Sequence, residues 1–381
     1  MNTDYTYNLL RKDFADNKQI VLFVGAGINY SSGHEILWND VMEHLFSSAL
    51  NQVASDKCLD IETMSTLKKM FHNGSPNLDT STLSLMKYTN NEFPAIFQAY
   101  IVKKTLGARY IPMVQNFIYE RINYEYIKKS FELYQKKATQ SKATKKKRKV
   151  SQIRGLYEIA RLVLLSPNIK AIVTYNYDNF ITQAINIIQA NPKYYFNSDE
   201  LRMYKNNVRL THSKNTKTHK NNKIVAIDIF GDKYNQTLHS GEIPIYHVHG
   251  YIPPKSEIQQ IDTNSIILSL DEFYDNIRNV YSWQTDTQMH FLSHYTCIFV
   301  GSSISDITIQ RMLYNAQLCG NNDRIYCFQA YGDDKKDNSM KDKVKRTLYH
   351  IKQDFFKEYG LSMISVDGKY DDMYDLINKL L

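Results

Sequence analysis

The chain has 381 residues, of which 43% are hydrophobic, and its 47 basic and 39 acidic side chains give a net charge of +8. This length fits one large core with insertions or two domains, and this apolar content is ample for a buried core. Much of the basic excess lies in one run from Lys136 to Lys149, so the charge favours acidic ligands or partners but does not by itself define a nucleic-acid-binding protein.

The cysteines and the apolar runs exclude further classes. None of the four cysteines forms a C-x-x-C pair, so neither a zinc ribbon nor a disulfide framework is indicated. The first residues lack the charged and apolar regions of a secretory signal, and no run approaches about 18 apolar residues. We therefore expect a soluble, cytoplasmic protein with no membrane partner.

Short apolar runs bounded by turn residues predict six buried parallel strands, at about 20–25, 171–175, 245–249, 296–300, 325–329 and 362–366. Helical spacing of apolar residues follows several of them. These residues are Trp38, Val41, Met42, Leu45 and Phe46, then Ile309, Met312 and Leu313, and finally Met373, Leu376, Ile377 and Leu380. Strand alternating with helix predicts an α/β fold with a Rossmann-like doubly wound parallel sheet.

Two segments interrupt this alternation. Residues of about 50–165 show helical periodicity without strand runs, which predicts a helical insertion or subdomain. Residues of about 190–243 are polar, which predicts a loop-rich insertion or lid with one further strand at Ile224–Ile227. Within the first segment, Lys142–Lys149 resembles a nuclear-localisation or nucleic-acid patch, although such runs are more often solvated loops.

Three patches of polar and small residues follow predicted strands. They are Gly25-Ala26-Gly27, the segment from Thr174 to Asp178, and His249-Gly250. The carboxyl ends of parallel strands form the ligand crevice of an open α/β sheet, so glycine backbone, an amide, a carboxylate and an imidazole are expected to converge on one pocket. This arrangement is typical of an enzyme.

Each patch also has a purely structural interpretation. The dehydrogenase fingerprint requires a third glycine where Tyr30 stands, so Gly25-Ala26-Gly27 alone equally suits a plain turn. Asn176 and Asp178 suit a cap for a helix beginning near Phe180, and Asp306 suits a cap for the helix that holds Ile309. His247 and His249 share a strand face, but no third ligand of suitable spacing is visible, so we expect no metal.

Taken in order, the motifs resemble the sirtuin family. They are Gly25-Ala26-Gly27 with Ser31-Ser32-Gly33, the T-x-N-x-D at Thr174, Asn176 and Asp178, His249-Gly250, and Gly301-Ser302-Ser303. The resemblance covers the α/β core and neither insertion. It implies one discontinuous NAD-binding domain across residues 1–381.

The chain departs from deacylating sirtuins in two places. Their mobile Ile-Pro-Asp-Phe-Arg loop aligns with His34-Glu35-Ile36-Leu37-Trp38, and their four-cysteine zinc ribbon is missing. The early tryptophan, the added helical segment and Asp306 are similar to bacterial sirtuin-like proteins of antiphage defence, which degrade NAD. Among these, a stand-alone chain of this size is similar to proteins encoded beside a HerA-type hexameric ATPase, which implies that ATPase and a homo-oligomer as partners.

The resemblance also implies roles for single residues. Asn176 would orient the ribose and the attacking water, His249 would act as the general base, and Asp178 would fix nicotinamide or a neighbouring group. Ten further residues would contact NAD. Ala26 and Gly27 would lie at the diphosphate, Asn29 would replace the family's serine, and Gly301, Ser302 and Ser303 would lie at the adenosine ribose. The full set is Gly25, Ala26, Gly27, Asn29, Ser31, Thr174, Gly301, Ser302, Ser303 and Asp306.

The sequence thus predicts an NAD glycohydrolase that releases nicotinamide and ADP-ribose and depletes NAD as a defence effector. Two other functions stay open. One is a module that senses NAD or ADP-ribose, which needs the glycine turn but not His249, and the other is an NAD-dependent deacylase or ADP-ribosyltransferase, which needs a protein acceptor. A role on DNA would rest on the basic run from Lys136 to Lys149.

Overall fold

The computed structural model describes residues 3–29, 95–139, 153–211, 223–257, 261–279, 281–302, 306–319, 324–330, 340–366 and 371–381, with single positions at 41, 44, 45, 48, 49, 52 and 304. Several stretches named by the sequence analysis lie outside these residues. They are residues 30–38, Met42, Phe46, most of residues 50–94, the basic stretch Lys142–Lys149 and Ser303.

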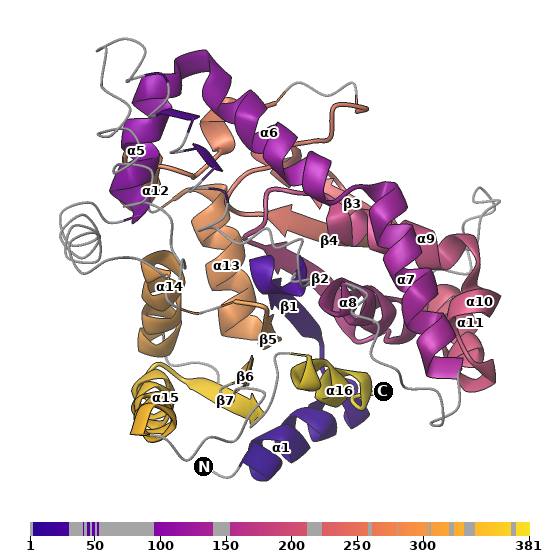
Figure 1. Cartoon of the computed structure of the whole chain (residues 1–381). Coiled ribbons are helices and arrows are strands. Elements are labelled where there is room, and N and C mark those ends of the chain that lie inside the picture. Colours follow the sequence, from indigo (N-terminus) through magenta and orange to yellow (C-terminus); the bar gives the residue numbers. More distant parts are fainter. Residues whose placement is uncertain are drawn as a thin grey trace.

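A seven-stranded parallel sheet forms the centre of the molecule (Figure 1), in the order β3-β4-β2-β1-β5-β6-β7. The strands are β1 Ile20–Val24, β2 Ile169–Thr174, β3 Val225–Ile229, β4 Glu242–His247, β5 Thr296–Val300, β6 Ile325–Ala330 and β7 Leu361–Val366. All six pairings are parallel. The doubly wound parallel sheet predicted from the sequence is confirmed, with the extra strand at 224–227 as its edge.

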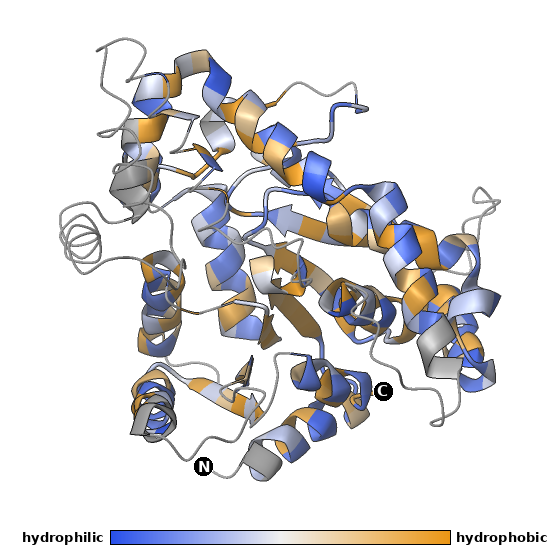
Figure 2. Ribbon diagram, viewed as in Figure 1, coloured by the Kyte–Doolittle hydropathy of each residue, from blue (hydrophilic) through white to orange (hydrophobic). Residues whose placement is uncertain are grey.

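Alternate residues of each strand point to opposite faces, so the sheet carries two cores. In β1, Ile20, Leu22 and Val24 belong to one core, whereas Val21 and Phe23 belong to the other. The central strands are largely orange when coloured by hydropathy (Figure 2), as expected for strands buried on both faces.

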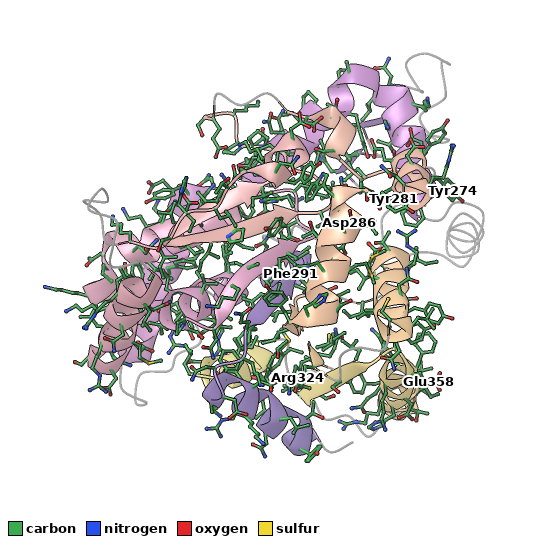
Figure 3. The ribbon with its side chains drawn as sticks, turned by 180° about the vertical axis from the view of Figure 1, so that it is seen from behind. Tyr274, Tyr281, Asp286, Phe291, Arg324 and Glu358 are labelled. Atoms are coloured by element: carbon green, nitrogen blue, oxygen red, sulfur yellow. The ribbon has the colours of Figure 1, made fainter. Side chains whose placement is uncertain are left out.

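Helices cover both faces of the sheet. The first core is closed by α1 Thr3–Ala15, α8 Arg154–Leu165, α9 Phe180–Ala190 and α16 Asp372–Asn378, and the second by α13 Trp283–His294, α14 Ile307–Leu318 and α15 Met340–Glu358. From behind (Figure 3), Phe291 lies on α13, and its ring is 5.6 Å from that of Tyr246 on β4. These three layers confirm an α/β fold.

The helix α8 is buried on every side. All its residues from Gly155 to Leu165 are buried, because its side chains belong to the first core and other helices pack around it. Those neighbours are α7 Tyr124–Thr139, α9, α11 Ser198–Thr211 and α16. A helix buried all round is expected in the interior of a multilayered domain.

The first predicted insertion is helical where the structure describes it. It contains α5 Ala95–Leu106, the 3₁₀ turn η2 Gly107–Arg109, α6 Tyr110–Arg121 and α7, which follow one another along the upper and right edges of Figure 1. Lys103 of α5 forms ion pairs with Asp271 and Glu272 of α12 Leu270–Arg278, which attaches α5 to the far part of the chain.

The second segment is more structured than the sequence predicted. Polar composition at 190–243 suggested loops, but the described part holds α10 Pro192–Tyr195, α11, β3 and the 3₁₀ turn η4 Gly231–Asn235. The strand β3 pairs with β4 and completes the sheet, and Tyr204 and Val208 of α11 are buried in the first core. The average hydrophobicity of the segment is low because only one face of the amphipathic helix α11 is apolar and buried, so composition alone did not indicate this helix.

Among the described residues, no helix is both long enough and apolar enough to cross a membrane.

Candidate functional site

The predicted patches meet at the carboxyl ends of four neighbouring strands. Backbone hydrogen bonds continue the sheet past these ends, from Gly25 N to Val300 O (3.1 Å), from Tyr175 N to Val24 O (3.0 Å) and from Val248 N to Thr174 O (3.1 Å). These bonds bring the segments after β1, β2, β4 and β5 to one edge of the sheet. The strand that follows β1 in the chain, β2, lies on one side of β1, whereas β5 lies on its other side. The strand order therefore reverses at β1, and ligands of open α/β sheets bind at such a topological switch point.

The turns after β1 and β5 are in backbone contact. A Cβ atom added at Gly25 would lie 2.7 Å from the carbonyl oxygen of Gly301, and one added at Gly301 would lie 2.6 Å from the backbone nitrogen of Ile28. Gly301 also has a φ of +69°, which disfavours other residues. Glycine is therefore required at both positions so that the two strand ends can approach.

The glycine turn continues into the 3₁₀ turn η1 Ala26–Asn29. The resemblance assigned the amides of Ala26 and Gly27 to a diphosphate, but the Gly27 N–H donates to the carbonyl oxygen of Gly301 at 2.8 Å. In this conformation the Gly27 amide closes the turn against β5 instead of pointing at a ligand.

Asn29 and Asp178 form a buried pair beneath the crevice. The Asn29 Nδ2 donates to Asp178 Oδ2 at 3.1 Å, and Asp178 Oδ1 accepts from the backbone N–H of Phe180 at 3.0 Å. Of the two residues named in the helix-cap interpretation, Asp178 therefore serves the first turn of α9, and at the same time it ties η1 to the segment after β2. Burial is the main cause that raises the pKa of Asp178 to about 6, against the opposing effects of the Phe180 amide, His247 and Asn29.

Asn176 is held by its backbone on both sides, while its side chain is held weakly. Its N–H donates to Thr174 Oγ1 at 3.1 Å, and its carbonyl oxygen lies 3.1 Å from Nδ1 of His247. Within the described part of the chain, the side-chain Nδ2 reaches the carbonyl oxygen of Gly25 alone, at 3.4 Å, which is long for a hydrogen bond. The amide is therefore in a fixed place with a bond that a ligand can replace.

His249 follows β4, the strand that neighbours β2 in the sheet. Its ring packs edge-on against Tyr175, with centroids 5.1 Å apart, and its Nε2 lies 4.0 Å from Asp306 Oδ2. Burial lowers the pKa of His249, and the Asp306 carboxylate opposes this shift in part. The imidazole is thus neutral at neutral pH, which is the form able to accept a proton.

Asp306 caps the helix that follows it, which is one of the two roles that the sequence left open, and it also lies near His249. Its Oδ1 accepts from the Thr308 N–H at 2.8 Å and caps α14, while Oδ2 faces His249. Ser302 lies in the turn between β5 and α14, where its Oγ accepts from the Ile304 N–H at 3.3 Å and its carbonyl oxygen accepts from Gln329 Nε2 at 2.8 Å. Ser31 and Ser303 lie outside the described residues.

Sequence reasoning overlooked three residues around the site. Tyr175 shields one side of His249 and donates its hydroxyl to Gln288 Oε1 of α13 at 3.0 Å. Asp228 of β3 lies 2.8 Å from Nε2 of His247. Two of these residues could have been found from the sequence. Asp228 is a single carboxylate within an apolar run typical of a strand, and Tyr175 lies inside the T-x-N-x-D motif. No sequence feature marks Gln288.

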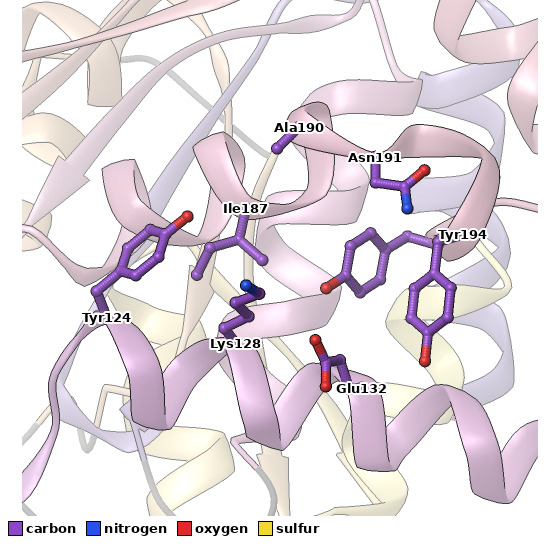
Figure 4. A pocket seen from close by; sticks show the side chains of 8 residues that line it. Tyr124, Lys128, Glu132, Ile187, Ala190, Asn191 and Tyr194 are labelled. Atoms are coloured by element: carbon purple, nitrogen blue, oxygen red, sulfur yellow. The ribbon is translucent and has the colours of Figure 1, made fainter.

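A separate hollow of about 520 Å³ lies between α7 and the α9–α10 corner (Figure 4). Tyr124, Lys128 and Glu132 face it from α7, and Ile187 and Asn191 are among those that face it from the other side. None of the candidate site residues lines this hollow, which lies at the C-terminal end of α9, whereas the crevice lies at its N-terminal end. Within the described residues, no group of three or more His, Cys, Asp or Glu side chains is arranged to hold a metal ion.

The parallel sheet, with these residues gathered at its switch point, is the arrangement typical of nucleotide-binding α/β proteins. Comparison with protein families agrees with this class, since residues 170–364, just over half of the chain, match the family described as SIR2-like domain. The chain therefore belongs to the SIR2-like domain family, whose members bind NAD. The matched region contains Asn176, Asp178 and His249, while the glycine turn after β1 precedes it. None of the curated proteins matches the chain.

Proposed function

We propose that this protein hydrolyses NAD to nicotinamide and ADP-ribose at the crevice formed by the ends of β4, β2, β1 and β5. The observation that carries the proposal is the pairing of a neutral imidazole, His249, with a fixed amide, Asn176, on adjacent strand ends beside the Gly25–Gly301 contact. An amide that orients the ribose and a base that accepts a proton are the groups that metal-free cleavage of the N-glycosidic bond requires.

The residues fit NAD in this place. Glycine at 25 and 301 lets the turns after β1 and β5 come into backbone contact, which holds the two strand ends together at this edge of the sheet. The weak bond from Asn176 Nδ2 to Gly25 O leaves the amide free to exchange this partner for a ribose hydroxyl. Within the described chain, the buried Oδ1 of Asn29 has no hydrogen-bond partner, so the floor of the crevice retains an unused acceptor.

The proposed chemistry balances without a further reactant. The bond between ribose C1′ and the nicotinamide nitrogen breaks, and its electron pair neutralises the charged nicotinamide ring. The oxygen of a water molecule bonds to C1′ on the opposite face, and its proton passes to His249, either directly or through a ribose hydroxyl. Asn176 would hold the ribose and the water in line, and the Asp306 carboxylate would stabilise the imidazolium once it forms.

We also propose that this activity depletes NAD in a defence response and is restrained by assembly. The support is the resemblance to sirtuin-like defence proteins, including the proposed HerA-type ATPase partner, together with exposed apolar side chains. On α14 and α15, Ile307, Leu318, Leu348 and Ile351 are each about 60% exposed or more. Light scattering tests the homo-oligomer, and co-purification with the neighbouring ATPase tests the partner.

The purified chain, alone and with a genomically adjacent ATPase, is incubated with NAD and the products are separated by chromatography. Nicotinamide and ADP-ribose in equal amounts are expected. Binding of NAD without any cleavage under either condition would instead select a sensing module. Nicotinamide release that requires a protein acceptor, with ADP-ribose or an acyl group transferred, would select a transferase or deacylase.

A further inference from the structure

His247, two residues before the proposed base, is a buried histidine with both ring nitrogens occupied. Its side chain is 1% exposed. Nδ1 lies 3.1 Å from the backbone oxygen of Asn176, and Nε2 lies 2.8 Å from Asp228 Oδ1. The ring centroids of Phe230 and Tyr251 lie 6.5 and 4.8 Å from the centroid of the imidazole. This histidine therefore joins β2, β4 and the edge strand β3.

The chemistry of the partners fixes one proton. A backbone carbonyl oxygen can only accept a hydrogen bond, so Nδ1 of His247 must carry a hydrogen and donate it to Asn176. On the other side, Asp228 also accepts from the hydroxyl of Thr182, with distances of 3.0 and 2.8 Å to its two oxygens. Asp228 is thus itself held by α9, and it holds the far side of the ring, as carboxylates hold the rings of functional histidines.

We propose that His247, held by Asp228, is a positioning residue that fixes the peptide of Asn176 and so aims the Asn176 amide at the ribose. This inference rests on the proposed NAD hydrolysis. Thr174 Oγ1 holds the N–H of Asn176 and His247 holds its carbonyl oxygen, so the two bonds clamp the residue from both sides. Edge strand β3, in the segment expected to be a lid, thereby contributes to the floor of the site.

Two substitutions separate this role from a structural one. Asparagine at 247 places its Nδ2 where the imidazole has Nδ1, so His247→Asn keeps the donor to Asn176 and loses the bond to Asp228. Glutamine places its Nε2 where the imidazole has Nε2, so His247→Gln keeps the bond to Asp228 and loses the donor to Asn176. Both variants remove the ring and leave comparable space, which makes them matched controls for each other.

The measurement compares kcat, NAD affinity by calorimetry and the thermal midpoint in both variants, with exposed His350→Ala as an outside control. His247→Gln is expected to lose about 100-fold in kcat with a smaller loss of NAD affinity, since a small misplacement of a substrate-orienting group costs on this order. His247→Asn is expected to lose less than about tenfold, even where its thermal midpoint falls further. The reverse order, or losses in both variants that follow the unfolded fraction, would overturn the proposal.

A readout that does not depend on catalysis separates this inference from the proposed function. With ¹³C-carbonyl asparagine and ¹⁵N-tyrosine labelling, only the three Asn-Tyr peptides, at 29–30, 123–124 and 176–177, give a coupled signal. The signal of the peptide between Asn176 and Tyr177 is identified by its loss in Tyr177→Phe. The carbonyl shift is expected to move in His247→Gln and to stay near the wild-type value in His247→Asn. If the wild-type protein fails to cleave NAD, the proposed function fails while this pattern still supports the clamp. An unmoved carbonyl shift in both variants overturns the clamp whatever the activity.

Discussion

Asp178 and Asn29 illustrate how single residues connect the turn after β1 with the helix after β2. Their contact joins residues far apart in the sequence, and it places a carboxyl group in the interior under the crevice. The sequence left two roles open for Asp178, a cap for the helix that follows and a contact near nicotinamide, and the structure shows that it accepts from the first amide of α9. The sequence did not reveal the contact with Asn29, since no local pattern records which buried side chain a distant turn will meet.

The raised pKa of Asp178 has a consequence for stability. Its pKa in the folded state is about 6, above the value of 3.8 expected when exposed, so between these pH values the folded protein binds more protons than the unfolded one. The free energy of unfolding is expected to fall as pH rises from about 4 to 6, by at most about 3 kcal/mol from this group.

Asp178→Asn is expected to abolish this part of the pH dependence. Asparagine keeps the oxygen that accepts from the Phe180 amide, and a rotated Asn29 amide presents its unpaired oxygen to the new donor. Urea unfolding of both proteins between pH 4 and 7 gives the measurement. A stability difference between them that does not change with pH would contradict the assignment.

The environment of His249 predicts the pH dependence of NAD cleavage. Burial lowers the pKa of the imidazole, so the neutral base persists at neutral pH and the rate falls only as the solution becomes acidic. Asp306 raises this pKa in part, so Asp306→Asn is expected to move the acid limb of the rate profile to lower pH.

Asparagine caps helices about as well as aspartate, so this variant leaves α14 in place. The profile of kcat/KM against pH, measured for the wild type and for Asp306→Asn, checks the direction of the shift. An acid limb that moves to higher pH, or does not move, would refute the electrostatic link between Asp306 and His249.

At the level of elements, the strand ends could be foreseen and their fine contacts could not. Continuous apolar runs mark buried strands, and parallel strands bring their carboxyl ends to one edge, so the convergence of Thr174–Asp178 with His249 followed from the sequence. The direction of the Gly27 amide did not follow, because it depends on how closely β5 approaches. The strand at 224–227 was predicted, but the helices of residues 192–211 were missed, since a polar average conceals one buried stripe.

The contact between the glycine turn and β5 predicts unequal effects of two similar substitutions. Gly301→Ala combines a φ of +69° with a Cβ 2.6 Å from a backbone atom and is expected to cost about 3 kcal/mol or more. Gly107→Ala has a φ of +54° with no atom within 4 Å of the new Cβ, so about 1 kcal/mol is expected. Chemical unfolding measures both costs, and equal losses would show that the close approach does not constrain the fold.

Across the molecule, the last helix supports the first turn. Tyr374 of α16 donates its hydroxyl to the carbonyl oxygen of Gly27 at 3.3 Å, while Tyr7 of α1 donates to the carbonyl oxygen of Leu376 at 2.8 Å. Residues near both ends of the described chain are therefore joined below the crevice, as Figure 1 shows for α1 and α16. Apolar periodicity predicted the helix α16. Its contact with Gly27 could not be predicted, because the complete sheet is needed to bring the glycine turn and the last helix together.

Tyr374→Phe and Tyr7→Phe form a matched pair. Each removes one hydroxyl that bonds to a backbone oxygen, so each is expected to lower the free energy of unfolding by about 1 kcal/mol. Only Tyr374→Phe is expected to weaken NAD binding, since Tyr374 contacts the glycine turn. Calorimetric titration with NAD distinguishes the two variants, and equal affinities would show that α16 supports the fold without supporting the site.

The central claim is that Asn176 and His249 cleave NAD in this crevice. The most direct test is nicotinamide release by the wild type, Asn176→Ala, His249→Ala and the exposed control His350→Ala, in the condition in which the wild type is active. The account predicts that the two site variants stay folded and lose turnover by about 100-fold or more, while His350→Ala behaves as the wild type. Unchanged nicotinamide release in both Asn176→Ala and His249→Ala would contradict it.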